Sequence, residues 1–203
     1  MGTRKYELRR RAERQAETRR RIVEAVVALH REIGPARTTI TAIAERAGVE
    51  RLTVYRHFGD ETALFAACSA HHRAEAQPPQ PEAWTGVADP VERLRAALLA
   101  FYGYYGREED MLANIQRDAP RLPALEAVLA PSREFVQGVR EGLLAQWPAP
   151  GRARPELAAA IGHALRFETW QSLTRSEGLG DAEAADLMVG LARVAAASAP
   201  GPG

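Results

Sequence analysis

The sequence predicts an all-α protein of about nine helices, with a small three-helix N-terminal domain followed by a larger helical domain. Apolar residues recur along most of the chain at i, i+3, i+4 and i+7, the spacing that gives a helix one buried face. Proline, glycine and capping residues separate these segments, as they do at helix ends. No segment alternates polar and apolar residues over a sustained length, so we expect no β-strand.

The composition favours a globular protein of the cytoplasm. Of the 203 residues, 46% are hydrophobic and 26% are charged, as in folded domains. No apolar run approaches the roughly 20 residues needed to span a bilayer, so we expect no membrane association. The basic N-terminus lacks the apolar core of a signal peptide. With a single cysteine, Cys68, the chain cannot form an internal disulfide.

Charge is distributed unevenly along the chain. Residues 1–75 contain 15 Lys and Arg against 10 Asp and Glu, whereas residues 76–203 contain 12 against 16. The excess is concentrated in residues 1–21, of which 1–17 form a basic arm that either extends the first helix or stays mobile. This division is typical of a nucleic-acid-binding domain joined to a non-binding one, although a solvated helix face has the same composition.

A helix, a tight turn and a second helix follow the arm. An apolar stripe from Ile22 to Ile33 predicts the first long helix, which a Gly-Pro pair ends. Thr39 is a suitable N-cap for the next helix, and Gly48 supplies the turn after it because glycine readily adopts the left-handed conformation.

The short helix after this turn carries side chains suited to DNA. Val54 and Phe58 fall on its inward side, so Arg51, Tyr55 and Arg56 face outward. The pattern predicts a helix-turn-helix, whose second helix lies in the DNA major groove. Arginine binds guanine edges and phosphates, and hydroxyl groups bind phosphates. A surface helix of an ordinary bundle is the alternative interpretation.

Prolines mark the boundary between the two domains. A helix capped by Asp60 is expected to fade near residues 77–81, which contain three prolines. We therefore predict an arm at 1–17, a helix-turn-helix domain at 18–76 and a helical domain at 82–203.

Three motifs resemble the N-terminal domain of TetR-family transcriptional regulators. They are TTI at 38–40, IAERAGV at 43–49 and TVYRHF at 53–58, within a resemblance that covers 18–72. The resemblance implies a transcriptional repressor associated with the nucleoid, with the domain at 82–203 serving ligand binding and dimerisation. By that resemblance, Thr39 and Thr41 bind DNA at the start of the helix that precedes the Gly48 turn. In the helix after the turn, four residues face the bases: Arg51, Leu52, Thr53 and Arg56. Tyr55 and His57 contact the DNA backbone.

Two positions depart from the family pattern. Members often have serine where Glu50 stands and usually lysine where Glu61 stands. A carboxylate at Glu61 repels phosphate, so we expect that contact to be absent and the arm at 1–17 to compensate.

The resemblance also implies a homodimer that binds a palindromic operator in double-stranded DNA. Its interface would be formed by the last two helices, at about 155–177 and 181–197. These helices carry more apolar residues than one buried face of a monomer needs: Leu157, Ile161, Leu165, Leu187, Met188, Leu191 and Val194. A buried monomer core is the alternative interpretation.

Regulators of this family usually enclose a pocket for a small-molecule effector, which releases the DNA. The candidate wall residues are Phe101, Tyr102, Tyr105, Met111, Ile115, Phe135, Phe167 and Trp170. Ordinary core packing is the alternative for each of them. Tyr102, Tyr105 and Trp170 are favoured because a buried hydroxyl or indole N–H needs a partner that a ligand could supply.

We expect no enzyme activity, no metal site and no cofactor. The sequence has no glycine-rich phosphate loop and no nucleophile elbow, and Cys68 lies on an apolar helix face with no evident base beside it. A helical adaptor that binds proteins is the alternative function.

Overall fold

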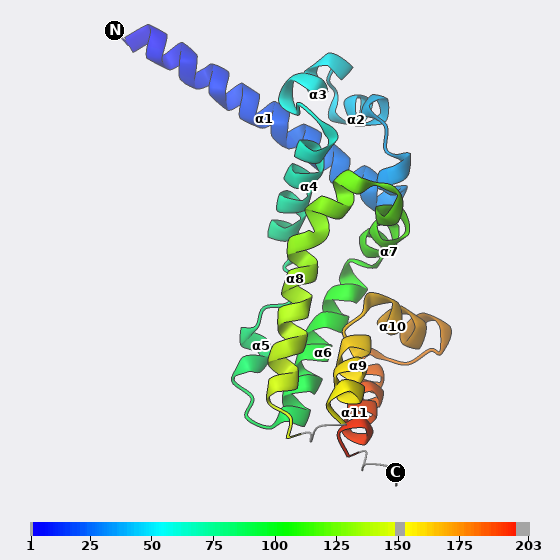
Figure 1. Cartoon of the computed structure of the whole chain (residues 1–203). Coiled ribbons are helices and arrows are strands. Elements are labelled where there is room, and N and C mark those ends of the chain that lie inside the picture. The colour runs from blue at the N-terminus through cyan, green and yellow to red at the C-terminus, as the bar shows by residue number, and fades with distance from the viewer. Residues whose placement is uncertain (1, 149–152, 198–203) are drawn as a thin grey trace. The chain divides into compact units, whose positions relative to one another are not determined.

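The computed structural model describes residues 2–148 and 153–197 and is all-α over these ranges (Figure 1). The first half contains α1 (Gly2–Glu32), α2 (Ile40–Ala47), α3 (Arg51–His57), α4 (Glu61–Ala76), α5 (Glu82–Thr85) and α6 (Pro90–Arg107). The second half contains α7 (Glu109–Asp118), α8 (Pro123–Ala145), α9 (Ala153–Ala164), α10 (Phe167–Gln171) and α11 (Asp181–Ala197). Short 3₁₀ turns lie at Pro35–Arg37 and Ala119–Arg121, and a π-helical turn at Ser172–Ser176. The predicted fold class is confirmed. The described residues form eleven α-helices, two more than the predicted number of about nine, and the short helices α5 and α10 account for the difference.

The chain forms two compact units. The N-terminal unit contains the described residues up to Ala76 together with Asp110–Leu129, and the C-terminal unit contains Gln77–Glu109 and the described residues from Ala130. Part of the predicted domain at 82–203 therefore packs with the N-terminal helices. Helix α8 contributes to both units, and the division falls beside its internal Pro131.

The core of the N-terminal unit joins α1, α2, α3 and α4. Its buried residues come from the apolar faces that the sequence predicts, among them Ile22, Val26, Leu29, Ile43, Ala44, Ala47, Val54, Phe58, Leu64 and Cys68. Small alanines on α2 allow the helices to approach closely, and burial of the larger side chains contributes about 1.5–3 kcal/mol each. A second cluster packs Phe65 against Ala119 and Leu125.

The C-terminal end of α1 is held by α7. The Asn114 amide donates to the carbonyl oxygens of His30 and Arg31 at 3.0 and 2.8 Å. The buried Asp118 carboxylate accepts from the backbone N–H of Ala36 at 3.0 Å and is paired with Arg117. Hydrogen bonding to Arg117 lowers the pKa of Asp118, so the carboxylate stays ionised. These bonds satisfy backbone groups that the end of α1 leaves free.

The predicted helix at 155–177 is wrong, because the structure breaks it into α9, α10 and the π-helical turn. Arg166 has extended backbone angles and separates α9 from α10. The carbonyl oxygens released at this break accept hydrogen bonds from tyrosines of α6: Tyr102 donates to Ala164 at 3.0 Å and Tyr105 to Leu165 at 2.6 Å. Partners remote in sequence thus stabilise a break that local periodicity does not reveal.

Within the described ranges, no helix is both long and apolar enough to cross a membrane. Over the same residues, no group of three or more His, Cys, Asp or Glu side chains is placed to hold a metal ion.

Candidate nucleic-acid interface

The turn between α2 and α3 is fixed by its glycine and by an arginine of α1. Gly48 adopts the left-handed conformation with φ 62° and ψ 44°. The Arg21 guanidinium donates to the carbonyl oxygens of Ala47 and Gly48, the latter at 3.0 Å. At the other end of α2, the Thr39 hydroxyl oxygen accepts from the backbone N–H of Ala42 at 3.1 Å, which confirms the predicted N-cap. Sequence reasoning missed Arg21, because nothing in its spacing relates it to a turn 26 residues away.

Helix α3 turns one face into the core and the other to solvent. Val54 is buried, as is Phe58 directly after the helix. Leu52 and Tyr55 are 63% and 52% exposed, far more than large hydrophobic side chains usually are. Arg51 and Arg56 are exposed beside them. The structure therefore brings these four predicted DNA-binding residues to the outer face of α3. Thr39 and Thr41, in the cap and first turn of α2, are exposed as well.

Thr53 and His57 are half-buried and lie toward α1. Both line a cleft between α3 and the N-terminal part of α1. The Arg19 guanidinium joins α1 to the end of α3, since it donates to the His57 carbonyl oxygen at 3.0 Å and lies 4.1 Å from the Phe58 ring centroid. Thr53 also accepts a hydrogen bond from Arg56 at 3.3 Å. The resemblance assigns Thr53 to bases, but its position is at the side of the exposed surface.

Acidic residues occupy two helix starts beside this surface. Asp60 caps α4, since its carboxylate accepts from the backbone N–H of Ala63 at 2.7 Å. Glu61 follows it and is exposed. Glu50 precedes α3, is exposed and makes no capping hydrogen bond. Three carboxylates at these helix starts disfavour phosphate binding there.

A histidine lies against the cysteine, contrary to the expectation that Cys68 has no base beside it. The Nδ1 atom of His30 is 3.5 Å from Sγ of Cys68, and both side chains are buried. Burial raises the pKa of the Cys68 thiol to about 12 and lowers the pKa of the His30 imidazole to about 4. Both groups are therefore neutral at pH 7, and the pair lacks the thiolate that a cysteine nucleophile requires.

The eight candidate effector residues are divided between the two units. Phe101, Tyr102, Tyr105, Phe167 and Trp170 are buried together in the C-terminal unit, whereas Met111 and Ile115 belong to the N-terminal unit. Phe135, in the C-terminal unit, is exposed and stacks on Phe101 with the ring centroids 6.4 Å apart.

The polar atoms of these residues need no ligand, contrary to the expectation from sequence. The Tyr102 and Tyr105 hydroxyls donate to backbone carbonyls, as described above. The Trp170 indole N–H donates to the Asp181 carboxylate at 2.8 Å. Cavities of about 810 and 200 Å³ lie in the N-terminal unit, and none of the eight candidates lines either one. Core packing within the protein explains the burial of the five clustered aromatic side chains.

Most of the apolar residues expected at the dimer interface also pack within the chain. Leu157, Ile161, Leu165 and Met188 are buried. The other three lie on α11 and are exposed: Leu187 at 50%, Leu191 at 44% and Val194 at 69%. Their spacing of four and three residues places them on one face of the helix.

Comparison with known proteins identifies the N-terminal helices. Residues 22–68 match the family model of bacterial regulatory proteins of the tetR family. The HTH-type transcriptional regulator TtgR of Pseudomonas putida is 37% identical over 101 residues, which are 47% of this chain and 46% of that protein. The alignment thus spans about half the length of this curated relative.

Solved structures share the fold over most of the chain. A TetR-like transcriptional regulator from Rhodococcus sp. RHA1 has a TM-score of 0.64 at 22% identity, covering 87% of this chain and 94% of its own. NalD of Pseudomonas aeruginosa, the secondary repressor of the MexAB-OprM multidrug efflux pump, has a TM-score of 0.57 at 23% identity, covering 89% and 96%. The matched segment assigns the helix-turn-helix at residues 22–68 to the tetR family of bacterial regulatory proteins, and the solved structures show that the fold is shared over most of the chain.

Proposed function

We propose that the protein is a sequence-specific DNA-binding transcriptional repressor that acts as a homodimer on a palindromic operator and is released by a small-molecule effector. The outer surface of α3 is the observation that carries this proposal. Arg51, Leu52, Tyr55 and Arg56 are exposed on a helix whose opposite side is anchored by Val54 and Phe58.

This arrangement has the chemistry that base and backbone recognition need. Arg51 and Arg56 can donate two parallel hydrogen bonds to guanine, and Leu52 can contact a thymine methyl group. The Tyr55 hydroxyl and the Thr39 hydroxyl hydrogen can donate to phosphate, which fixes the register of the helix on the duplex. The interface side chains are presented by a packed core, so binding requires little reordering of the backbone.

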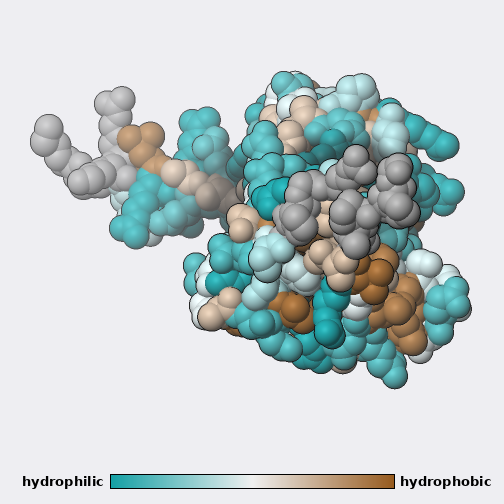
Figure 2. Space-filling model, turned by 60° about the horizontal axis from the view of Figure 1, so that its bottom comes forward, coloured by the Kyte–Doolittle hydropathy of each residue, from teal (hydrophilic) through white to brown (hydrophobic). Residues whose placement is uncertain are grey.

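A second copy of the chain supplies the symmetry for a palindromic operator. Leu187, Leu191 and Val194 form an apolar strip on α11 that is exposed in the single chain. Figure 2 shows one face of the molecule, on which hydrophobic areas interrupt a mostly hydrophilic surface. In a two-fold dimer the two α3 helices would enter successive major grooves about 34–36 Å apart.

The match to the tetR family and the shared fold of NalD, which is itself a repressor, support repression. Release by an effector is what the family resemblance implies. An effector must bind the DNA-incompetent state more tightly than the competent one. We propose that the C-terminal unit opens for it in a minor conformation, since its aromatic cluster is filled in the state described. The protein would act in the cytoplasm on the nucleoid.

Selection of genomic fragments tests the proposal. The protein is mixed with sheared DNA of its source genome, and bound fragments are sequenced and then titrated by gel shift. We expect a palindrome bound at sub-micromolar Kd in roughly 100–200 mM salt, within the range for specific sites. The double variant Arg51→Ala with Tyr55→Ala should lose this binding and keep its melting temperature, because both side chains are exposed.

Arg73→Ala is the control, since it removes an exposed arginine of α4 outside the proposed surface. It should bind the palindrome as the wild type does. If no sequence is enriched, the proposed function is wrong and a protein-binding adaptor becomes the better interpretation. If the double variant unfolds, the assigned orientation of α3 is wrong.

A further inference from the structure

The N-terminal part of α1 forms one wall of a cleft whose other wall is α3. The cleft has a volume of about 810 Å³ and is lined by Tyr6, Glu7, Arg10, Arg11, Arg14, Gln15 and Thr18 of α1 with Thr53 and His57 of α3. The apolar stripe that anchors α1 in the core begins only at Ile22. At 1.5 Å per residue, the helix therefore carries Tyr6 roughly 24 Å beyond that anchor. Figure 1 shows these turns extending past α2, α3 and α4 of the same unit.

The arm is thus a continuous helix, and contacts at its base set its direction. Arg19 binds the carbonyl oxygen of His57 and covers the Phe58 ring, while Arg21 binds the turn before α3. These two residues link α1 to the turn that precedes α3 and to the last residue of α3.

Two exposed arginines of α1 are paired with carboxylates. Arg9 is paired with Glu13, and Arg20 with Glu17 and Glu24, at 2.7–2.9 Å. Neither Arg9 nor Arg20 lines the cleft.

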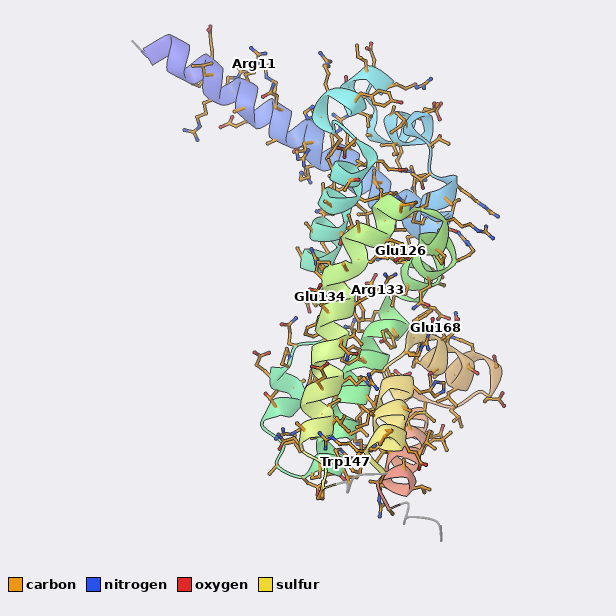
Figure 3. The ribbon with its side chains drawn as sticks, in the orientation of Figure 1. Arg11, Glu126, Arg133, Glu134, Trp147 and Glu168 are labelled. Carbon is orange, nitrogen blue, oxygen red and sulfur yellow. The ribbon has the colours of Figure 1, made fainter. Side chains whose placement is uncertain are left out.

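Three arginines line the cleft: Arg10, Arg11 and Arg14. Among the described residues, none of the three has a carboxylate within ion-pair distance. Arg11 lies on the extended part of the helix in Figure 3. Glu7 is the one carboxylate in the lining, so the cleft has a net charge of +2 from three arginines and one glutamate when His57 is neutral.

The arginines of the cleft repel one another, and Glu7, three and four residues before Arg10 and Arg11, offsets only part of this repulsion. Arg10 and Arg14 are four residues apart on an exposed helix, where like charges repel each other. Residues 6–17 are exposed and bury no apolar face that would compensate. A polyanion in the cleft would remove the repulsion, and guanidinium groups bind phosphate oxygens with paired hydrogen bonds.

We propose that the cleft receives the sugar-phosphate backbone of one DNA strand, held between the α1 extension and the side of α3. Arg10, Arg11 and Arg14 bind phosphates from one wall. Thr53 and His57 bind from the other, which explains their half-buried position beside the base-facing surface. The proposal rests on the proposed function, and it extends the contact with DNA beyond the recognition helix. It also supplies phosphate contacts that Glu50 and Glu61 cannot make.

Salt dependence on a duplex of fixed sequence tests this proposal. The probe is a fluorescein-labelled duplex of mixed sequence, about 40 base pairs long, and anisotropy gives Kd between roughly 50 and 200 mM KCl. Each phosphate contact adds about −0.9 to the slope of log K against log salt. The triple variant Arg10→Gln, Arg11→Gln, Arg14→Gln should therefore flatten the slope by up to roughly 2.7. Over this fourfold change in salt, the wild type should lose up to roughly 40-fold more affinity than the variant.

Arg9→Gln, Arg20→Gln, Arg73→Gln is the matched control, because it removes three positive charges outside the cleft. It should keep a slope close to that of the wild type. Ala16→Pro keeps every charge but breaks the exposed helix between the arm and the core. It should behave like the cleft variant, with the core intact by its circular dichroism melting curve.

If the two triple variants flatten the salt slope equally, net charge alone explains the effect, and the proposed binding of DNA in the cleft is wrong. A wild-type slope in Ala16→Pro would overturn the requirement for a rigid arm. If the wild type binds DNA and the cleft variant matches it, this inference fails while the proposed function stands. If the wild type binds neither this duplex nor any selected palindrome, both fail.

Discussion

The imidazole of His30 lies against the thiol of Cys68, with Nδ1 3.5 Å from Sγ, inside the core that joins α1 to α4. The contact connects the C-terminal end of α1 to the helix that follows α3. His30 also packs on the Phe65 ring, with the centroids 5.6 Å apart. A titratable side chain is therefore enclosed in the core that supports α3, so protonation of this side chain at low pH should destabilise that core.

We predict that stability falls as the pH falls from about 6.5 to about 4. Burial lowers the pKa of His30 from 6.5 to about 4, although the Asp118 charge opposes this shift. Over that window the unfolded chain binds a proton that the folded protein does not, so acid favours unfolding. At 1.36 kcal/mol per pH unit the loss is on the order of 3 kcal/mol.

Urea unfolding at several pH values measures this loss. His30→Gln should remove most of the pH dependence, whatever its stability at pH 7. His71→Gln, on α4 and only half-buried, should retain the wild-type dependence. If His30→Gln keeps the full slope between pH 4 and 6.5, other groups cause it and the assignment to His30 is wrong.

Gly34 is the second position with a clear consequence for stability. Its backbone, with φ 89° and ψ 159°, lies in a region that essentially only glycine occupies. A Cβ atom there would meet Asp118 Oδ2 at 2.5 Å and would clash with the Arg117 guanidinium. Gly34→Ala should therefore destabilise the N-terminal unit by roughly 1–3 kcal/mol or more.

Gly138→Ala should increase stability where Gly34→Ala decreases it, and it serves as the control. Gly138 lies inside α8, with no atom within 4 Å of an added Cβ. Alanine should stabilise that helix by roughly 0.5–1 kcal/mol. Thermal unfolding of both variants tests the pair, and a neutral Gly34→Ala would mean that α7 does not hold the end of α1 as described.

The exposed strip on α11 makes a prediction about assembly. Leu187→Glu together with Leu191→Glu should convert a homodimer to a monomer, because two buried carboxylates per copy would be desolvated without partners. Light scattering after size exclusion measures the mass. Ala182→Glu, exposed on another side of α11, should leave the dimer intact. A wild type that is monomeric at tens of micromolar would contradict the proposed dimer.

Sequence reasoning succeeds where one local signal decides the structure. The Thr39 and Asp60 caps, the Gly48 turn and the buried face through Val54 each follow from neighbouring residues. It fails where distant groups decide. The break after Ala164 depends on tyrosines about 60 residues earlier.

The placement of α7 and the arm are further examples of this limit. Asp110–Leu129 reads as part of the second domain, but Asn114 and Asp118 bind the end of α1 about 80 residues earlier. The charge of the arm is evident from composition. Which arginines face α3 depends on the angle of α1, and Arg19 and Arg21 set that angle through contacts 27–38 residues away.

The tyrosines of α6 provide the last prediction, because they replace the ligand contacts expected from sequence. Tyr102→Phe removes the donor to the Ala164 carbonyl, and Tyr105→Phe removes the donor to Leu165. Each leaves a buried carbonyl unsatisfied, which costs roughly 1–3 kcal/mol. Tyr104→Phe is the matched control on the same helix, since its hydroxyl donates to neither of these carbonyls, and its melting temperature should stay near wild type. If Tyr102→Phe and Tyr105→Phe melt as the wild type does, these hydroxyls do not hold the break between α9 and α10, and they are again available to an effector.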